Sequence, residues 1–253
     1  MAEISANPAT PGVPWETAVR CHPGRLREIN EDAYLARPDL GLWAVADGMG
    51  GHAAGDLASR TVVSWLDRIQ PTRDLEGLVQ AVERAVAEAH GAIRAESITR
   101  NHETIGSTVA VLAAHSRRCT VLWAGDSRVY LYRAHALRRL SRDHSVAQER
   151  ISQGDLPASQ AEDSPDANVL TRAVGMEGDL ALDRISLPVR PGDVFLLCSD
   201  GLNKELTDDE LQSILSAPQS LDTLAQRMLE QSLVRGGRDN ITLILVRYLD
   251  TGR

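Results

Sequence analysis

Short apolar runs separated by polar turns recur along most of the chain and predict a protein rich in β-strands. Many of these runs carry β-branched or aromatic residues, which strands favour. The runs between residues 104 and 133 are joined by short turns, so we expect them to form an antiparallel meander. The strands predicted in this way are 15–20, 33–37, 42–46, 104–114, 118–125, 127–133, 136–140, 181–187, 193–199 and 241–248.

Longer segments with helical periodicity lie between these strands. Asp74 is a candidate N-cap, and Thr207 with Glu210 forms a capping-box pattern. The order of strands, two helices, many strands, two helices and a last strand indicates an α+β sandwich of antiparallel sheets with helices outside. The predicted helices are 52–69, 74–97, 146–153, one opened by Thr207, and 220–234.

The length of 253 residues suits one large domain or at most two small ones. No repeat, linker or composition shift marks a boundary, so residues 15–248 are expected to form a single domain. Residues 1–14 are predicted to be a disordered lead-in, and 249–253 a short tail. The polar stretch 141–175 shows little periodicity, and a long irregular insert of this kind is usually functional or mobile.

Composition excludes several classes of function. A net charge of −8 and a pI near 5.4 argue against non-specific nucleic-acid binding, which needs a basic face. No apolar run approaches the ~20 residues of a membrane span, and the first residues do not resemble a signal peptide. Cys21, Cys119 and Cys198 are odd in number and widely spaced, which favours reduced cysteines in a cytoplasmic protein.

Five acidic turns are the candidate chemistry. The clearest is Asp47, which follows the apolar run 42–46 and precedes a glycine-rich stretch. One at a time, Asp beside Gly or Asn is ordinary turn chemistry. Together, carboxylates that converge on one rim of a sandwich repel one another and need cations to hold them. The turns are Asn30-Glu31-Asp32, Asp47-Gly48, Gly125-Asp126-Ser127, Ser199-Asp200-Gly201 and Arg238-Asp239-Asn240.

All-oxygen ligands favour Mg²⁺ or Mn²⁺ over zinc, which prefers nitrogen and sulfur. Two such ions can activate a water and neutralise a phosphoryl group. An arginine near the site could then grip the phosphate, because its planar fork matches two phosphate oxygens. Arg27, five residues before Asp32, is the candidate.

These motifs, in this order, resemble the metal-dependent serine/threonine protein phosphatases of the PPM or type 2C family in their bacterial form. The resemblance covers about residues 15–248, and eight ordered motifs make a chance match negligible. The matching pieces are RxxNED at 27–32, DGMGGHxxG at 47–55, GST at 106–108, GDSR at 125–128, DHS at 143–145, NVLTRAVG at 168–175, SDGL at 199–202 and RDNIT at 238–242.

The resemblance implies a four-layer α-β-β-α sandwich of two antiparallel sheets flanked by helices. It implies hydrolysis of phosphoserine and phosphothreonine by a metal-bridging hydroxide, without a phosphoenzyme, using two to three Mn²⁺ or Mg²⁺ ions. It also implies phosphorylated protein substrates, a partner serine/threonine kinase and a monomer. A role beside a secretion-system kinase, as in type VI secretion, is a further possibility of the same kind.

The resemblance also assigns roles to residues. Asp47 bridges two metals, and Gly48 offers its carbonyl oxygen to the second. Asp32 and Glu31 act on the second metal directly or through water, and Arg27 binds the substrate phosphate. The segment of about 143–175 corresponds to a mobile flap that shapes substrate access. The remaining implied metal ligands are Asp200 and Asp239 for the first metal, and Asp126 with Asp200 for a third.

One position departs from the eukaryotic members of the family, which have a histidine two residues after the bridging aspartate. Here that position is Met49, and His52 is the nearest candidate to protonate the leaving serine or threonine oxygen. An ordinary histidine pKa near 6.5 suits that task. The other reading of His52 is that it caps or lines the helix that follows.

Three alternatives arise from the same sequence. Residues 48–53 fit a loose G-x-G-x-x-G/A dinucleotide fingerprint with Asp67 about 20 residues on, but two successive helices break the βαβ unit. Cys21 and Arg27 have the C-x5-R spacing of a cysteine phosphatase, yet Pro23 removes a backbone donor and no helix follows. The third alternative, a catalytically inactive phosphatase-fold module, is disfavoured because all the principal metal ligands are present.

Overall fold

The computed structural model describes residues 3–7, 14–50, 53–100, 105–157, 160, 166 and 169–249. Two six-stranded sheets pack face to face, and every strand pair within them is antiparallel. The first sheet has the order β1 (Glu3–Asn7), β2 (Trp15–His22), β12 (Ile241–Tyr248), β11 (Val194–Cys198), β8 (Arg128–Arg133) and β9 (Ala136–Arg139). The second has the order β10 (Asp183–Pro188), β7 (Arg118–Ala124), β6 (Val109–His115), β4 (Leu42–Met49) and β3 (Asp32–Arg37), with β5 (Gly106–Ser107) paired to β4.

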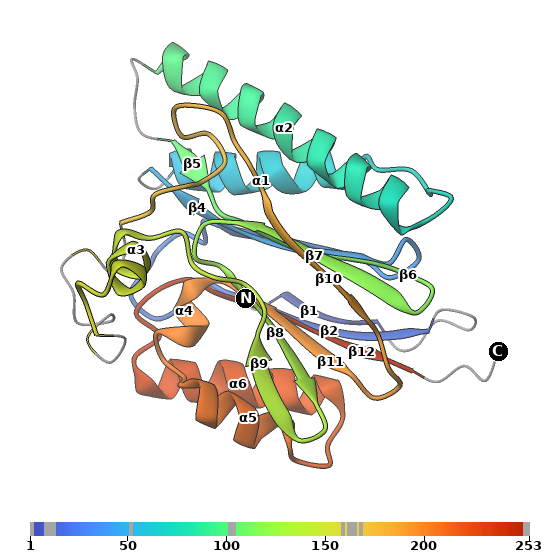
Figure 1. The fold of residues 1–253 in the computed structure, drawn as a ribbon. Coiled ribbons are helices and arrows are strands. Elements are labelled where there is room, and N and C mark those ends of the chain that lie inside the picture. Colours follow the sequence, from blue (N-terminus) through green and yellow to red (C-terminus); the bar gives the residue numbers. More distant parts are fainter. Residues whose placement is uncertain are drawn as a thin grey trace.

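Helices cover the outer faces of both sheets (Figure 1). The long helices α1 (Ala53–Asp67) and α2 (Leu75–Thr99) pack on the second sheet, and α5 (Asp208–Leu215) and α6 (Leu221–Arg235) pack on the first. The short helices α3 (Val146–Gln153) and α4 (Asp200–Asn203) lie at the left end of the sandwich in Figure 1. The predicted four-layer α-β-β-α fold is therefore confirmed.

The predicted helix starts rest on observed caps. Asp74 accepts a hydrogen bond from the backbone N–H of Gly77, and Thr207 and Glu210 complete a capping box. Ser220 caps α6 through the N–H of Thr223. A polar side chain that satisfies an otherwise unpaired N–H sets where each helix begins.

Alternating side chains of β4 divide the core into layers. Leu42, Ala44 and Ala46 face the helices, whereas Trp43 and Val45 face the layer between the sheets. Trp43 is fully buried there, and its indole N–H donates to Thr17 Oγ1 at 3.0 Å. The period of two therefore directs Asp47 along the inter-sheet face, at the point where that layer reaches the rim.

The predicted meander is wrong at one step. β6 and β7 pair as expected, but β8 pairs with β9 and β11 in the other sheet, so the chain crosses between sheets after β7. Gly125 makes the crossing with φ +105°, a backbone conformation that favours glycine. The sequence pattern of a short polar turn between two apolar runs is the same whether the two strands form a hairpin or belong to different sheets.

The ends of several predicted strands also differ. β4 continues through Asp47 to Met49, because β5 pairs with Gly48 and Met49. The run predicted as 104–114 is split at Thr108, whose N–H donates to Asp47 O at 2.8 Å and thereby leaves the regular ladder. Helix α4 was not predicted, since four residues are too few to show a period.

Within the predicted lead-in 1–14, Glu3–Asn7 form an edge strand that pairs with residues 17–21 of β2. An edge strand offers unpaired N–H and C=O groups, and backbone bonds to them need no side-chain pattern. Residues 1–2, 8–13 and 250–253 of the expected lead-in and tail lie outside the described residues, as do 101–104 and parts of the flap. Among the described helices, none combines the length and the apolar character needed to cross a membrane.

Candidate metal centre

Asp32 and Asp47 face one another across two neighbouring strands. They are direct partners in the antiparallel β3–β4 pair, so their side chains lie on the same face, at the rim of the inter-sheet layer. Asp32 is only 6% exposed. The register of the two strands therefore brings the two carboxylates together at one rim, as the acidic turns predicted.

Close backbone packing holds the end of β4 against the loop before β3. The Gly48 N–H donates to the Glu31 carbonyl at 3.1 Å. A Cβ on Gly48 would lie 2.1 Å from the Gly55 carbonyl oxygen, so only glycine fits here. The Glu31 carboxylate lies beside Gly55, at the first turn of α1. Glu31, Gly48 and the start of α1 thus form one compact unit next to Asp47.

Asn240 fastens this loop to the turn that carries Asp239. Its Oδ1 accepts a hydrogen bond from the Glu31 N–H at 2.8 Å. Its Nδ2 donates to the carbonyls of Pro23 and Ile29. One buried amide therefore fastens the loop at Pro23, Ile29 and Glu31, on both sides of Arg27, to the residue before β12.

Ser199 connects Asp32 to the end of β11. Its hydroxyl donates to Asp32 Oδ2 at 2.7 Å and accepts from the Thr242 N–H at 3.0 Å. Asp200 follows at the first position of α4, one residue after the serine that bonds Asp32, and it shares the ammonium group of Lys204 with Asp239. Asp200 and Asp239 thus reach the rim from adjacent strands of the first sheet, opposite Asp32 and Asp47 of the second.

Asp126 joins the site at the crossing between the sheets. Thr108 Oγ1 accepts from the Asp47 N–H at 3.0 Å and is 2.6 Å from Ser127 Oγ. The Gly125–Ser127 turn is thereby fastened to the end of β4. The crossing that the sequence did not predict is what brings Asp126 toward the other carboxylates.

The electrostatics show that these carboxylates repel one another. Burial raises the pKa of Asp32 to about 7, with Asp200 and Asp239 adding to it against the hydrogen bond from Ser199. Burial and the charges of Asp200 and Asp143 raise the pKa of Asp126 to about 7. Burial, followed by the charges of Asp32 and Asp200, raises the pKa of Asp47 well above its ordinary value.

Two basic side chains contact the cluster. Arg27 Nε lies 3.0 Å from Asp239 Oδ1, and its side chain is 48% exposed. Lys204 Nζ contacts Asp200 Oδ2 and lies 3.3 Å from Asp239 Oδ2. Sequence reasoning singled out Arg27 but missed Lys204. A signal was present, since Lys204 stands one helical turn after Asp200 and is the single lysine of the chain.

The donor set fits a hard divalent cation. All the side chains are carboxylates, and Asp32 Oδ1 is buried without a hydrogen bond. Among the described residues, however, no three acidic, histidine or cysteine side chains already surround one point at which an ion could sit. Ion binding therefore requires the carboxylates to turn toward a common centre and to leave some of their present partners.

Two neighbouring positions concern the general acid. His52 lies outside the described residues. Met49 pairs with Gly106 between β4 and β5, and a Cβ on Gly106 would lie 2.6 Å from the Met49 side chain. Met49 therefore packs against a glycine and presents no group that transfers a proton.

The geometry contradicts the dinucleotide interpretation. β4 has only antiparallel partners, and two helices follow it, so there is no βαβ unit. Asp67 lies at the end of α1 and forms an ion pair with Arg37 at 3.1 Å. A ribose-binding carboxylate would instead end a second parallel strand.

The cysteine-phosphatase interpretation also fails. Cys21 lies inside β2, where its sulfur accepts hydrogen bonds from Asn30 and Thr242. A reactive loop would instead aim backbone N–H groups and a helix N-terminus at the phosphate. Cys21, Cys119 and Cys198 form no disulfide, and Cys119 and Cys198 are buried in β7 and β11.

The root of the predicted flap is built from paired charges. The Asp143 carboxylate accepts hydrogen bonds from Nε and Nη2 of Arg128, the second at 2.7 Å. His144 Nδ1 accepts from the Gly125 N–H at 3.2 Å, and its other nitrogen faces Asp183 and Arg172. These contacts fasten the flap segment to the same crossing that carries Asp126.

Comparisons with known proteins give a consistent result. A family model described as protein phosphatase 2C matches residues 26–237. The serine/threonine phosphatase stp of Listeria monocytogenes strain EGD-e is 34% identical over 232 residues, covering 88% of this chain and 92% of that protein. PstP of Mycobacterium tuberculosis is 32% identical over 235 residues, covering 92% of this chain and 45% of that longer protein.

Solved structures show the same architecture. PppA, described as a key regulatory component of T6SS in Pseudomonas aeruginosa, superposes with a TM-score of 0.86 at 43% identity, covering 92% of this chain and 97% of PppA. The catalytic domain of PstP in complex with two manganese ions superposes with a TM-score of 0.83 at 30% identity, covering 93% of this chain and 99% of that one.

Proposed function

The chain belongs to the protein phosphatase 2C family, and from that premise we propose which of its residues carry out the reaction. It is a metal-dependent serine/threonine protein phosphatase, whose substrates are phosphoproteins. Manganese is a cofactor supported by the PstP complex.

We assign the metal ligands to the rim carboxylates. Asp47 would be shared by two ions, because strand register sets it opposite Asp32 and the charges of Asp200 and Asp239 also act on it from the other sheet. The Gly48 carbonyl, with Asp32 and Glu31 directly or through water, would hold the second ion. Asp200 and Asp239 would hold the first ion, and Asp126 with Asp200 would hold a third. Mg²⁺ is an alternative to Mn²⁺ on the same oxygen ligands.

When bound, such ions activate a water for in-line attack and neutralise charge on the phosphoryl group. Arg27 orients the substrate: its guanidinium is exposed at the rim and already bound to Asp239, so it can turn to a phosphate without leaving the site. Attack by water implies no phosphoenzyme.

The observation that carries this proposal is the convergence of Asp32, Asp47, Asp126, Asp200 and Asp239 from separate segments onto one rim. The test is hydrolysis of a phosphothreonine peptide by the full chain, before and after EDTA treatment and after Mn²⁺ addition. We expect activity that EDTA abolishes and Mn²⁺ restores, and that Asp200→Asn reduces severely. The Cys21→Ser variant should remain active.

Three results would contradict the assignment. Activity that survives EDTA but is lost in Cys21→Ser would favour cysteine chemistry. Near-normal turnover and metal affinity in Asp200→Asn would remove Asp200 from the site. A chain that binds Mn²⁺ but hydrolyses no phosphopeptide would be the inactive binding module.

His52 is the proposed general acid. Replacing it by Ala should lower turnover of a phosphopeptide more than turnover of p-nitrophenyl phosphate, whose leaving group needs little protonation. Equal losses on both substrates would exclude this role for His52.

The cellular setting is inferred from the activity and from relatives. We infer that the enzyme opposes a serine/threonine kinase in signal transduction and acts as a cytoplasmic monomer, in keeping with three cysteines that form no disulfide. The likeness to PppA supports type VI secretion as the pathway. The test of this opposition is deletion of the gene: we expect the phosphoproteins made by the kinase to lose their turnover in the deletion strain.

A further inference from the structure

Besides Arg27, which pairs with Asp239, the acidic rim holds a second cation, the ammonium group of Lys204. It contacts Asp200 Oδ2 and lies 3.3 Å from Asp239 Oδ2. Its side chain is only 32% exposed. Both of its partners are proposed ligands of the same metal ion, so the ammonium group binds oxygen atoms that this ion needs.

The backbone places Lys204 at this point. The residue follows α4, and its N–H donates to the Asp200 carbonyl at 2.9 Å, one turn back. Residues four apart on a helical turn lie on the same side, so a long basic side chain here returns over the Asp200 carboxylate. The contact is therefore a product of local geometry rather than of a chance surface encounter.

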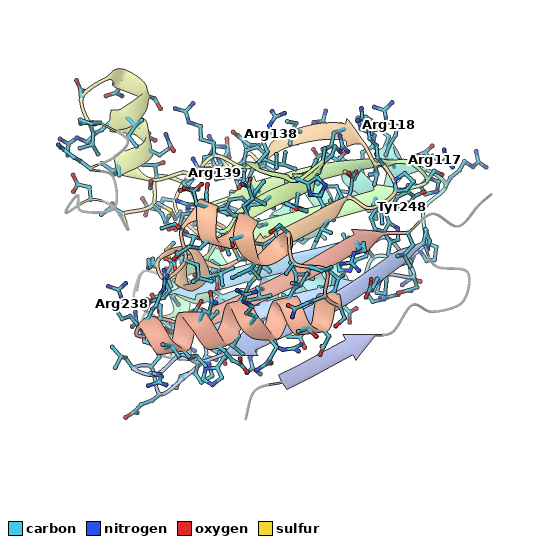
Figure 2. The ribbon with its side chains drawn as sticks, turned by 90° about the horizontal axis from the view of Figure 1, so that it is seen from below. Arg117, Arg118, Arg138, Arg139, Arg238 and Tyr248 are labelled. Atoms are coloured by element: carbon cyan, nitrogen blue, oxygen red, sulfur yellow. The ribbon has the colours of Figure 1, made fainter. Side chains whose placement is uncertain are left out.

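The rest of the positive charge of the chain is arginine. Lys and Arg together number 27, of which 26 are arginine and one is Lys204. Arg238, the neighbour of Asp239, is directed to another carboxylate, because its Nε donates to Glu205 Oε1 at 3.0 Å. Figure 2 shows Arg238 at one end of the molecule and Arg117 and Arg118 at the other.

The charge of Lys204 reaches a third carboxylate. Burial opposes the ammonium form, but Asp200, Asp239 and Asp126 together raise the pKa of Lys204. In return, Lys204 counteracts the rise in the pKa of Asp200 and of Asp126. One tethered charge thus contacts Asp200 and Asp239 and offsets part of the negative charge that surrounds them.

We propose that Lys204 is a built-in competitor of the divalent cation: its ammonium group holds Asp200 and Asp239 in the metal-free enzyme and must be displaced before an ion binds there. This inference rests on the proposed metal site. It makes Lys204 a positioning residue that sets the concentration of metal at which the enzyme becomes active. It also follows that Lys204 opposes occupancy of the place between Asp126 and Asp200.

The test is isothermal titration of Mn²⁺ into the metal-free full chain, for the native protein and three variants. Lys204→Gln removes the charge, and Lys204→Arg keeps it. Arg100→Gln is the matched control, because it also removes one positive charge and one ion pair between residues four apart, at the C-terminal end of α2 and without contact to a rim carboxylate. Melting temperatures with and without saturating Mn²⁺ accompany the titrations.

We expect Lys204→Gln to bind Mn²⁺ about tenfold more tightly, because a unit charge a few ångströms from the ion is removed. Its metal-free form should melt below the native protein, and saturating Mn²⁺ should abolish the difference. Lys204→Arg and Arg100→Gln should keep the native affinity. An unchanged or weaker affinity in Lys204→Gln overturns the inference.

Two further results separate the inference from its premise. If neither the native protein nor any variant binds Mn²⁺, the proposed metal site itself is wrong. If Lys204→Gln does not fold, the native protein labelled with ¹³C-lysine decides the matter, since a single lysine gives a single Cε signal. We expect that signal to shift when Mg²⁺ saturates the site, and a signal that stays in place while Mg²⁺ binds overturns the inference.

Discussion

The flap root and the carboxylate rim are neighbouring clusters of charged residues, and they differ in how their negative charges are paired. At the flap root, Asp143 is matched by Arg128, and Asp183 by Arg172, so each negative charge has a positive partner. At the rim, the basic side chains that contact the five carboxylates are, within the part of the chain that the structure describes, Lys204 and Arg27. The flap root is complete in itself, whereas the rim is held in place by the surrounding sheets and needs cations from outside.

The largest expected effect comes from removing a rim charge. Asp47→Asn should reduce phosphopeptide turnover by at least about a hundredfold, since even partners behind the metal ligands cost ten- to a hundredfold when lost. The same change should raise the Tm of the metal-free protein by a few degrees, because it removes repulsion. Turnover assays and calorimetry check both halves. A lower metal-free Tm would mean that the rim is stabilised by its own contacts.

The same exchange at the flap root should have the opposite sign. Asp143→Asn leaves the Arg128 guanidinium, only 15% exposed, without its charged partner. Loss of one member of a buried pair costs about 3 kcal/mol or more. Denaturant unfolding should therefore show a clear loss of stability in both metal-free and Mn²⁺-loaded protein. A neutral result would show that the paired charges do not stabilise the flap root.

The pH dependence of the rim follows from its raised pKa values. Asp32 and Asp126 have a pKa of about 7 in the folded chain, against roughly 4 when unfolded. Between these values the folded state binds more protons, so raising the pH costs stability. The Tm of the metal-free protein should fall from pH 5 to pH 8, and Mn²⁺ should restore it most at pH 8. The matched variant Asp126→Asn should show a shallower fall.

A smaller effect of opposite sign is expected at the flap root. Burial, with the nearby Arg172 charge, lowers the pKa of His144. The unfolded chain then binds more protons, so stability is lost as the pH falls below about 6.5. The Tm of the Mn²⁺-loaded protein should drop slightly between pH 7 and pH 5.5, and His144→Gln should flatten the drop. An equal drop in the variant would exclude His144 as its source.

Local chemistry made much of the fold predictable. Capping residues such as Asp74 and Thr207 predict helix starts, because their side chains accept hydrogen bonds from backbone N–H groups only three residues further on. The alternation in β4 likewise identifies its two faces. The crossing after β7 could not be predicted, because the partner of β8 is chosen by packing with β11, which lies far along the chain. The β1 strand was missed for a similar reason, since backbone pairing leaves no side-chain period.

The candidate site was predictable as a set of residues but not as an arrangement. Asp47 and Asp200 stand out because each follows an apolar run, and the order of the motifs adds the family resemblance. What the sequence did not reveal is that Asp32 lies directly opposite Asp47, or that Lys204 turns back onto Asp200. Both depend on which strands pair and on a helix of only four residues.

The pairing of Asp32 with Asp47 has one more consequence, for the folding of the chain. A slip of one residue between β3 and β4 would keep most backbone bonds of the sheet but send the two carboxylates to opposite faces. Such a misaligned chain would match the native protein in its content of strands and helices, yet it could not present both carboxylates to an ion at the proposed site. The affinity for Mn²⁺ therefore distinguishes a correctly folded molecule from one in which the β3–β4 register is shifted by one residue.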